Sequence, residues 1–409
     1  MDPCRPARGR MPGQRRRGRS HGPAWGRPGM GGLTAVSATD QERMGRMLLG
    51  QWCEAGDRSL GARVRARGVE YVVAEILAGR SPLPATTGIA GRVAAGTTYD
   101  DAVQRWIEPA LAQAERIGAR YVVPGDPEWP SQLDDLHDAA PLGLWVTGAG
   151  HLRLLALRSL SVVGARSATA YGEAIARELG AHLAECGWLT VSGGAFGIDA
   201  AAHRGALAAS GATACVLAGG VDVPYPRSHA DLLARIRESG VLVSESPLGG
   251  AAMRHRFLTR NRLIAALSRG TVLVEAAVRS GGRSTVREAA ALNRVVMAFP
   301  GPVTSPMSAG CHAVIREDTA QLVASPREVL ALVEGRLLLE DQGPATQADA
   351  LGWREQRVLD AVPARRPAPL ANIARLAGLG LAEAMAALGI LDALGLVRRA
   401  GEGWARSGA

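Results

Sequence analysis

Short apolar runs recur through the middle of the chain and alternate with amphipathic stretches. Each run ends at a glycine, a glutamate or a proline, and the next follows after roughly 25 to 30 residues. A strand, an amphipathic helix and a further strand at this spacing are typical of βαβ units with right-handed crossovers. The pattern therefore predicts an α/β fold with a doubly wound parallel, Rossmann-like sheet over residues 119–336. The predicted strands lie at 160–164, 189–193, 214–219, 241–245, 272–275 and 295–300.

Helical periodicity dominates on both sides of this region. Residues 41–118 carry apolar positions at helical spacing with glycine breaks, which predicts a small helical domain of the SAM or helix-hairpin-helix kind. Such helices can grip a DNA backbone, and plain helix packing is the alternative interpretation. After a polar linker at 337–349, three helical stretches and a hairpin predict a winged-helix module over 350–409. Its residues 371–391 hold few cations, so a protein-binding or vestigial role is as consistent with the pattern as DNA binding.

Every one of the 47 basic residues is an arginine, in a chain of formal net charge +9. The absence of lysine excludes phosphate loops that need one, as well as lysine nucleophiles and Schiff bases. Residues 1–40 hold eight arginines and two aspartates among many glycines and prolines, which predicts a disordered extension. Either this arm contacts nucleic acid or the start codon is misassigned, with Met30 or Met44 nearer the true one. The second interpretation is favoured.

The sequence carries no sign of a membrane segment or a metal site. No stretch reaches the ~18 uninterrupted apolar residues of a membrane helix, and the arginine-rich start lacks the apolar core of a secretory signal. The five cysteines show no spacing that suits zinc. These observations predict a cytoplasmic protein without a metal or another cofactor.

Glycine turns follow three of the predicted strands, at the edge where a parallel sheet binds its ligands. Glycine permits a tight turn and close approach of a backbone, and the helix that follows offers its N-terminal amides to an anion. Asp199, directly before a predicted helix, is interpreted chiefly as an N-cap, while Asp222 and Tyr225 are expected to shape the pocket. The predicted cradles consist of Gly164 and Arg166 in the first turn, Ser192, Gly193 and Gly197 in the second, and Ser280 and Gly281 in the third.

A basic and aromatic segment follows the predicted strand at 241–245. Arg260, Asn261 and Arg262 are expected at the start of a helix, where amide donors and cations converge on an anion. Guanidinium groups beside a ring suit a phosphate and a base together, and Glu275 could position one of these arginines. No nucleophile with a general base competes with this binding interpretation, so no catalytic residue is predicted. The ligand-contacting residues predicted from this segment are Arg254, Phe257, Arg260, Asn261 and Arg262.

Seven short motifs follow one another along the predicted sheet domain, at 164–166, 192–199, 221–226, 257–264, 274–281, 300–301 and 310–316. Together they resemble the DNA-processing protein A family, also called DprA or Smf. The resemblance implies a non-enzymatic homodimer that binds and protects incoming single-stranded DNA and loads the RecA recombinase onto it during natural transformation and DNA recombination. It assigns DNA binding to Arg166, Phe257, Arg260 and Arg262, with Arg254 a looser match.

The chain departs from this family in its second glycine turn. Where many members have Ala-Arg-Gly, it has Ala195-Phe196-Gly197, so a ring replaces one expected cation. The alternative function is that of a nucleoside-monophosphate phosphoribohydrolase of the lysine-decarboxylase-like group, whose glycine-rich loop is partly repeated at 280–288. The repeat is incomplete, because serines replace the proline and the third glycine. A DNA-binding regulator acting through 350–409 is disfavoured by the modest charge of that segment.

Overall fold

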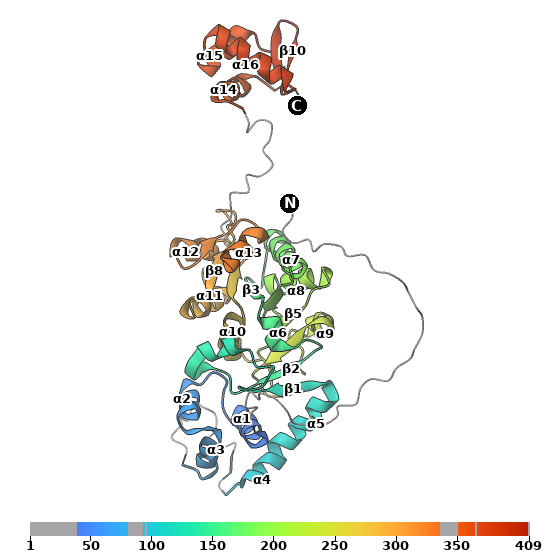
Figure 1. The fold of residues 1–409 in the computed structure, drawn as a ribbon, viewed down its shortest axis with the longest axis vertical. Coiled ribbons are helices and arrows are strands. Elements are labelled where there is room, and N and C mark those ends of the chain that lie inside the picture. Colours follow the sequence, from blue (N-terminus) through green and yellow to red (C-terminus); the bar gives the residue numbers. More distant parts are fainter. Residues whose placement is uncertain (1–38, 81–92, 95, 336–350, 365, 408–409) are drawn as a thin grey trace, which may run out of the picture. The chain divides into compact units, whose positions relative to one another are not determined.

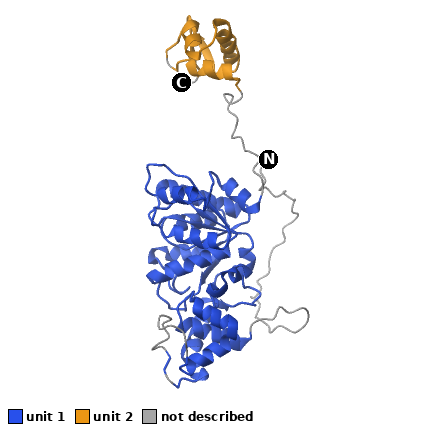
Figure 2. Ribbon diagram, turned by 90° about the vertical axis from the view of Figure 1, so that its left-hand side faces the viewer, with its two compact units in different colours: residues 1–337 blue, residues 338–409 orange. Residues whose placement is uncertain are grey.

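The computed structural model describes residues 39–80, 93–94, 96–335, 351–364 and 366–407. The chain divides into two compact units, residues 1–337 and 338–409, hereafter unit 1 and unit 2 (Figure 2). The predicted extension at 1–40, apart from its last two residues, and the predicted linker at 337–349 lie outside the described residues.

A nine-stranded sheet forms the centre of unit 1 (Figure 1). Its strands are β1 (Ala119–Val122), β2 (Leu144–Thr147), β3 (Ser159–Val163), β4 (Leu189–Ser192), β5 (Thr213–Val216), β6 (Val241–Ser244), β7 (Gly270–Leu273), β8 (Val295–Ala298) and β9 (Gln321–Leu322). Their order in the sheet is β1-β2-β6-β5-β4-β3-β7-β8-β9. The strands from β6 to β9 in this order pair in parallel, whereas β1 and β2 pair antiparallel at one end. The predicted α/β fold with a doubly wound parallel sheet is confirmed, and β1, β2 and β9 are additions to it.

Helices cover both faces of the sheet. One face carries α7 (Ala170–Glu185), α8 (Ile198–Ala208), α9 (Ala230–Ser239) and α13 (Pro326–Glu334). The other carries α6 (Leu152–Ala156), α10 (Arg254–Leu267), α11 (Gly282–Ala291), α12 (Ala309–Arg316) and the 3₁₀ segment η3 (Ser131–Ala139). Neighbouring residues of one strand serve opposite faces, since Val162 packs with α7 and α8 while Val163 packs with α10. Burial on both faces explains why these strands are continuous apolar runs.

The N-terminal helices pack against one end of the sheet. They are α1 (Asp40–Trp52), α2 (Arg58–Arg67), α3 (Val69–Leu77), α4 (Tyr99–Ala102), the π-helical segment η2 (Val103–Ile107) and α5 (Glu108–Ile117). Their buried side chains, Leu48 and Trp52 among them, share one hydrophobic core with Trp145 of β2 and Leu242 of β6. An ion pair of 2.7 Å between Arg43 and Asp126 adds a polar link. The helical segment predicted at 41–118 is therefore joined to the sheet within unit 1.

Unit 2 contains three helices followed by a β-hairpin, as the sequence pattern predicted. The elements are α14 (Trp353–Ala361), α15 (Leu370–Ala377), α16 (Leu381–Ala393), β10 (Val397–Ala400) and β11 (Gly403–Arg406). The hairpin pairs antiparallel. Val358, Ile373, Leu388 and Trp404 belong to a core that unit 2 forms by itself.

Two properties of the described residues bear on the predicted compartment and chemistry. No single described helix is long and apolar enough to cross a membrane, and the bent pair of α15 and α16 has enough length and hydropathy only when both helices, 101° apart, are taken together. No group of three or more His, Cys, Asp or Glu side chains in the described part of the chain is placed to hold a metal ion.

Candidate nucleic-acid interface

The strand order of the sheet reverses between β3 and β7. β3 pairs in parallel with β4 on one side and with β7 on the other, so the loops after all three strands leave the sheet at the same edge. Open parallel sheets bind ligands at such a point, beyond the carboxyl ends of their strands. The loops 164–169 and 274–281 leave the sheet here, and the loops after β4, β5 and β6 emerge at the same edge. The predicted site residues all lie on these strand ends and loops or on α10.

An exposed arginine and a half-buried ring meet at this carboxyl edge. The Arg166 guanidinium lies over the Phe257 ring, 4.9 Å from the ring centroid. The Tyr225 ring packs 5.3 Å from Phe257 at an interplanar angle of 54°, and Tyr225 is 46% exposed. Arg254, the first residue of α10, is also exposed. Within the described residues, neither Arg166 nor Arg254 has a carboxylate partner, so both guanidinium groups are available to an anionic ligand.

A second ring lies on the loop after β4. Phe196 is 49% exposed and packs against His229 in a T-shaped arrangement, with ring centroids 4.6 Å apart.

The sequence pattern did not predict the contact of Tyr225 with Phe257, because it assigned Tyr225 only to the shape of the pocket. Two residues that are far apart in sequence give no local pattern that reveals such a contact.

Helix α10 begins at Arg254, so the expectation that Arg260, Asn261 and Arg262 stand at a helix start is wrong. The segment 254–262 contains neither glycine nor proline and continues as helix into the apolar residues up to Leu267. Arg260, Asn261 and Arg262 therefore lie in the middle of the helix, and all three are buried. Their side chains are turned toward the protein interior instead of the solvent.

Arg260 supports the glycine turn after β4. Its Nη1 donates to the Gly193 carbonyl at 2.8 Å and to the Val216 carbonyl. A side chain at Gly193 would place its Cβ 2.6 Å from the same nitrogen, so any larger residue at this position would displace the Arg260 guanidinium. Burial lowers the pKa of Arg260, while the nearby Asp199 carboxylate opposes that shift. Arg260 thus holds this loop in place from the protein interior.

Asp199 holds the same loop through two of its backbone amides. Its carboxylate accepts hydrogen bonds from the Gly193 and Ala195 amides at 3.2 and 3.4 Å. Burial raises the pKa of Asp199, and Arg260 together with these amides counteracts the shift. The N-cap of α8 is Gly197, so the interpretation of Asp199 as an N-cap is wrong. Asp199 binds the amides of the loop that precedes the helix.

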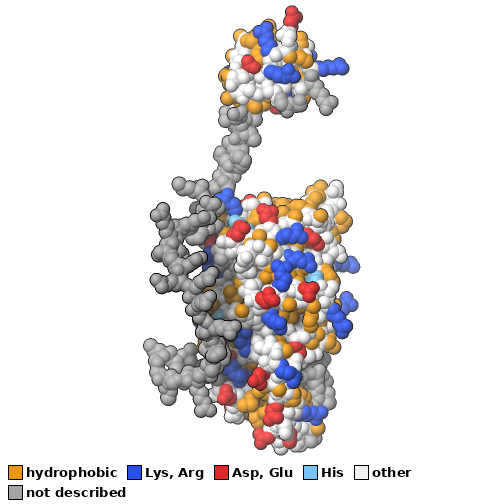
Figure 3. Space-filling model, turned by 90° about the vertical axis from the view of Figure 1, so that its right-hand side faces the viewer, with side chains coloured by type: hydrophobic (Ala, Val, Ile, Leu, Met, Phe, Trp, Pro, Cys, Tyr) orange, Lys and Arg blue, Asp and Glu red, His pale blue; other side chains and the backbone are white. Residues whose placement is uncertain are grey.

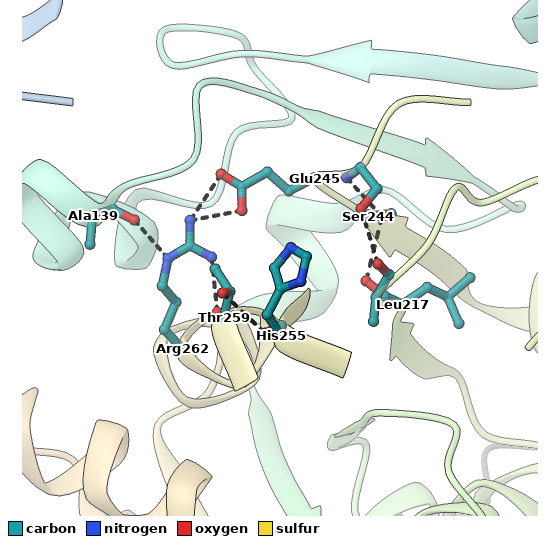
Figure 4. A network of polar contacts seen from close by, with 9 residues as sticks. Ala139, Leu217, Ser244, Glu245, His255, Thr259 and Arg262 are labelled. Atoms are coloured by element: carbon teal, nitrogen blue, oxygen red, sulfur yellow. Dashed lines mark hydrogen bonds and ion pairs between the residues drawn. The ribbon is translucent and has the colours of Figure 1, made fainter. Parts of the chain in front are cut away.

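Buried Arg262 forms an ion pair with the partly buried Glu245 and ties α10 to two neighbouring segments (Figure 4). Its Nη2 lies 2.7 and 2.9 Å from the Glu245 carboxylate oxygens. Its Nε donates to the Ala139 carbonyl at 2.9 Å, and its Nη1 to the Thr259 carbonyl at 3.2 Å. The carboxylate that positions an arginine of this segment is therefore Glu245, where the sequence suggested Glu275.

Glu275 instead occupies the start of helix α7. Its carboxylate accepts from the Thr169 amide at 2.9 Å and from the Thr169 hydroxyl at 2.6 Å. The protein thus supplies its own anion to the amides beside the first glycine turn. The expectation that this helix start receives a ligand anion is wrong, and Arg166 is the exposed basic group of that turn.

The remaining predicted cradle residues differ in how enclosed they are. Gly164 is enclosed, because a Cβ there would lie 2.6 Å from Ile198, and the Ser192 hydroxyl donates to the Val162 carbonyl at 2.6 Å. In the turn after β7, Gly281 is exposed and a Cβ added to it would meet no atom. The amide of the first residue of α11, Gly282, makes only a 3.4 Å contact with Ser280 Oγ. The Gly282 amide is therefore weakly engaged, whereas the Ser280, Arg283 and Ser284 amides donate to backbone carbonyls of the same turn at 3.0 to 3.3 Å.

Part of the surface of unit 1 has no concentration of positive charge. On the face shown in Figure 3, arginines lie interspersed with carboxylates and apolar side chains. Ion pairs such as Arg256 with Glu54, 2.8 Å apart, neutralise some of the cations. The unpaired arginines at the carboxyl edge therefore matter more than the net charge of the chain. Fold and site define a Rossmann-like protein whose sheet edge offers guanidinium groups and open rings to a phosphate-bearing ligand.

Comparisons with known proteins identify the family. The model of the family described as DNA recombination-mediator protein A matches residues 120–334. A putative DNA processing protein DprA of Mycobacterium tuberculosis is 46% identical over 293 residues, covering 69% of this chain and 75% of that protein. Protein Smf of Escherichia coli is 41% identical over 228 residues, covering 55% and 59%. The X-ray structure of DNA processing protein A from Streptococcus pneumoniae has a TM-score of 0.55 and 28% identity, covering 72% of this chain and 98% of that chain.

The family model spans more than half of the chain, and the Mycobacterium tuberculosis relative matches more than two thirds of it. The chain therefore belongs to the DNA recombination-mediator protein A family. This assignment confirms the resemblance inferred from the seven motifs and, with it, a role in DNA processing.

Proposed function

We propose that this protein binds single-stranded DNA at the carboxyl edge of its parallel sheet, without reading the base sequence. The exposed Arg166 guanidinium above the Phe257 ring is the observation that carries the proposal. A guanidinium group binds a phosphate, and an aromatic ring stacks on a base of any identity. Phe257 is half-buried and keeps part of its surface accessible beside the exposed Tyr225.

The predicted binding residues divide into two roles in this proposal. Arg166, Arg254 and Phe257 contact the strand directly. Arg260, Asn261 and Arg262 act as positioning residues, because they are buried and the two arginines are bonded to protein carbonyls and a carboxylate. In the glycine turns, Gly164, Gly197, Ser280 and Gly281 keep part of their surface accessible and line the path, whereas Ser192 and Gly193 are buried and support it.

The wider function is proposed by analogy with the family. We propose a cytoplasmic homodimer that protects incoming single strands and loads the RecA recombinase onto them during natural transformation and DNA recombination. The family description, DNA recombination-mediator protein A, supports the recombination part of this role. In this proposal the protein performs no catalytic step, since binding alone requires only the cations and rings of the carboxyl edge.

Equilibrium binding to a labelled oligo-dT strand tests the proposal. Replacing Arg166 or Phe257 by alanine is expected to weaken binding by about tenfold, because each loses a phosphate contact or a stacked base. Binding is expected to weaken with salt, and Arg166→Ala to lower the salt slope by about 0.7 for the lost phosphate contact. Undiminished binding by both variants would place the site elsewhere. Release of adenine from AMP by the pure protein would support the phosphoribohydrolase alternative.

A RecA assay on the same strand separates a loader from a plain binder. The parent protein is expected to increase RecA assembly on oligo-dT, measured as DNA-dependent ATP hydrolysis, and Arg166→Ala to lose that increase. Strand binding without any effect on RecA would leave the binding proposal in place and overturn the loading step.

A further inference from the structure

Two aromatic rings on the outer part of the carboxyl edge lie outside the hydrophobic core of the fold. Phe196 and Tyr225 are 49% and 46% exposed, while most large apolar side chains of unit 1 are buried. A single exposed ring is ordinary on a protein surface. These two lie on consecutive loops of the edge at which parallel sheets bind ligands, after β4 and after β5.

A ring contact with His229 holds Phe196 in place. Its ring packs against the imidazole of His229 with an interplanar angle of 64°. His229 is itself buried, and its Nδ1 lies 3.1 Å from the Gly194 carbonyl of the Phe196 loop. The ring is therefore oriented before any ligand arrives, and its other surface remains open. Such preorganisation lowers the entropy lost when a ligand stacks on the ring.

The Phe196 loop lies directly against the Arg166 loop. The Ile198 amide donates to the Ala165 carbonyl at 3.2 Å. A Cβ at Gly197, whose φ is +72°, would lie 2.7 Å from the Arg166 carbonyl oxygen. Arg166 therefore adjoins both parts of the edge: its backbone contacts the loop that carries Phe196, and its guanidinium lies over Phe257.

We propose that Phe196 is a second base-stacking residue, so that the site holds two bases of one strand with Arg166 at the phosphates between them. This inference rests on the proposed function and adds a binding position to it. One base stacks on Phe257 and Tyr225, the other on the open surface of Phe196. Stacking needs only the π-face of a base, which keeps the second position tolerant of sequence.

Binding of Phe196→Leu to two strands of equal length tests the proposal. On oligo-dT, the variant is expected to bind about fivefold more weakly than the parent, because leucine keeps the apolar contact with His229 but offers no π-face. On a strand of abasic sites, parent and variant are expected to bind equally. Phe196→Trp serves as the matched control and is expected to retain parental affinity for oligo-dT.

The outcomes separate this inference from the function on which it rests. If Phe196→Leu binds oligo-dT like the parent while Phe257→Ala loses affinity, the second stacking position is overturned and the proposed function stands. If neither variant changes binding, the proposed function fails as well. An equal loss on the oligo-dT and abasic strands would also overturn stacking, because the defect would then not depend on a base. Equal melting temperatures of Phe196→Leu and the parent exclude unfolding as the cause of a loss.

Discussion

The two edges of the parallel sheet both carry arginines over aromatic rings, yet only one edge has the properties of a binding site. At the amino edge, Arg158 and Arg269 lie over the ring of Trp188, at 5.3 and 5.9 Å from its centroid. Trp188 is only 2% exposed, so no base can reach its ring. At the carboxyl edge, Arg166 lies over Phe257. The Phe257 ring is half-buried and packs against the exposed ring of Tyr225. An arginine above a ring can bind a phosphate and a base together only where the ring is open to the base.

The arginines of the carboxyl edge differ among themselves in the same way. Arg166 and Arg254 are exposed, whereas Arg260 and Arg262 are buried under the loops that they hold. One short motif, Arg-Asn-Arg within a basic segment, therefore belongs to the interior although its composition suggests a surface. Substitutions can distinguish arginines that support the loops from arginines that contact the ligand, and they therefore test the comparison of the two edges.

The largest expected effect is a loss of stability on removal of Arg262. Arg262→Ala leaves the Glu245 carboxylate, whose side chain is only 10% exposed, without its partner, which is expected to lower the free energy of unfolding by about 3 kcal/mol. Urea denaturation followed by tryptophan fluorescence measures the change. Arg294→Ala is the control, because Arg294 pairs with an exposed Asp135 and is expected to cost less than about 1 kcal/mol. Full stability of Arg262→Ala together with lost DNA binding would identify Arg262 as a contact residue.

The second effect compares the edges directly. Arg269→Ala at the amino edge is expected to change affinity for oligo-dT by less than about twofold, because its ring partner is closed to bases. Arg166→Ala at the carboxyl edge is expected to weaken binding by about tenfold. Anisotropy titrations of the two variants under one salt condition measure the difference. Equal losses would mean that both edges contact the strand and that ring exposure does not decide the site.

Much of the fold follows from local pattern, because strands buried on both faces appear as apolar runs such as 160–164 and 241–245. β9 escapes this logic because its two residues are exposed, and β1 because three of its four residues are only partly buried. The location of the site also follows from pattern, since glycine turns after parallel strands lie at one edge. Burial of Arg260 and Arg262 does not follow, because the carbonyls and the carboxylate that receive them come from distant segments.

A third effect concerns the anchoring of α10 at its exposed end. Arg256 and His255 lower the pKa of Glu54 from 4.5 to about 2. A carboxylate with a lowered folded-state pKa adds stability above its unfolded-state pKa, and the contribution is lost as the pH falls from about 5 to 2. Because Glu54 is partly solvent-screened, we expect a contribution of about 1 kcal/mol or less. Glu54→Gln should therefore lose less stability than the parent over this range in urea titrations, and an unchanged acid-induced loss would contradict the assignment.

The smallest effect is expected from removing unit 2. Its helix α16 stands where a winged helix often presents a helix to DNA, yet the exposed side chains of α16 include Leu381, Met385 and Ile390. α16 contains two acidic residues and no arginine, so it has no cation for a phosphate. Deletion of 338–409 is expected to change affinity for oligo-dT by less than about twofold, and unit 2 alone, which has its own core, to bind much more weakly than the whole chain. A tenfold loss on deletion would shift the main site from the open rings of the sheet edge to unit 2, and the ring-exposure argument would fail.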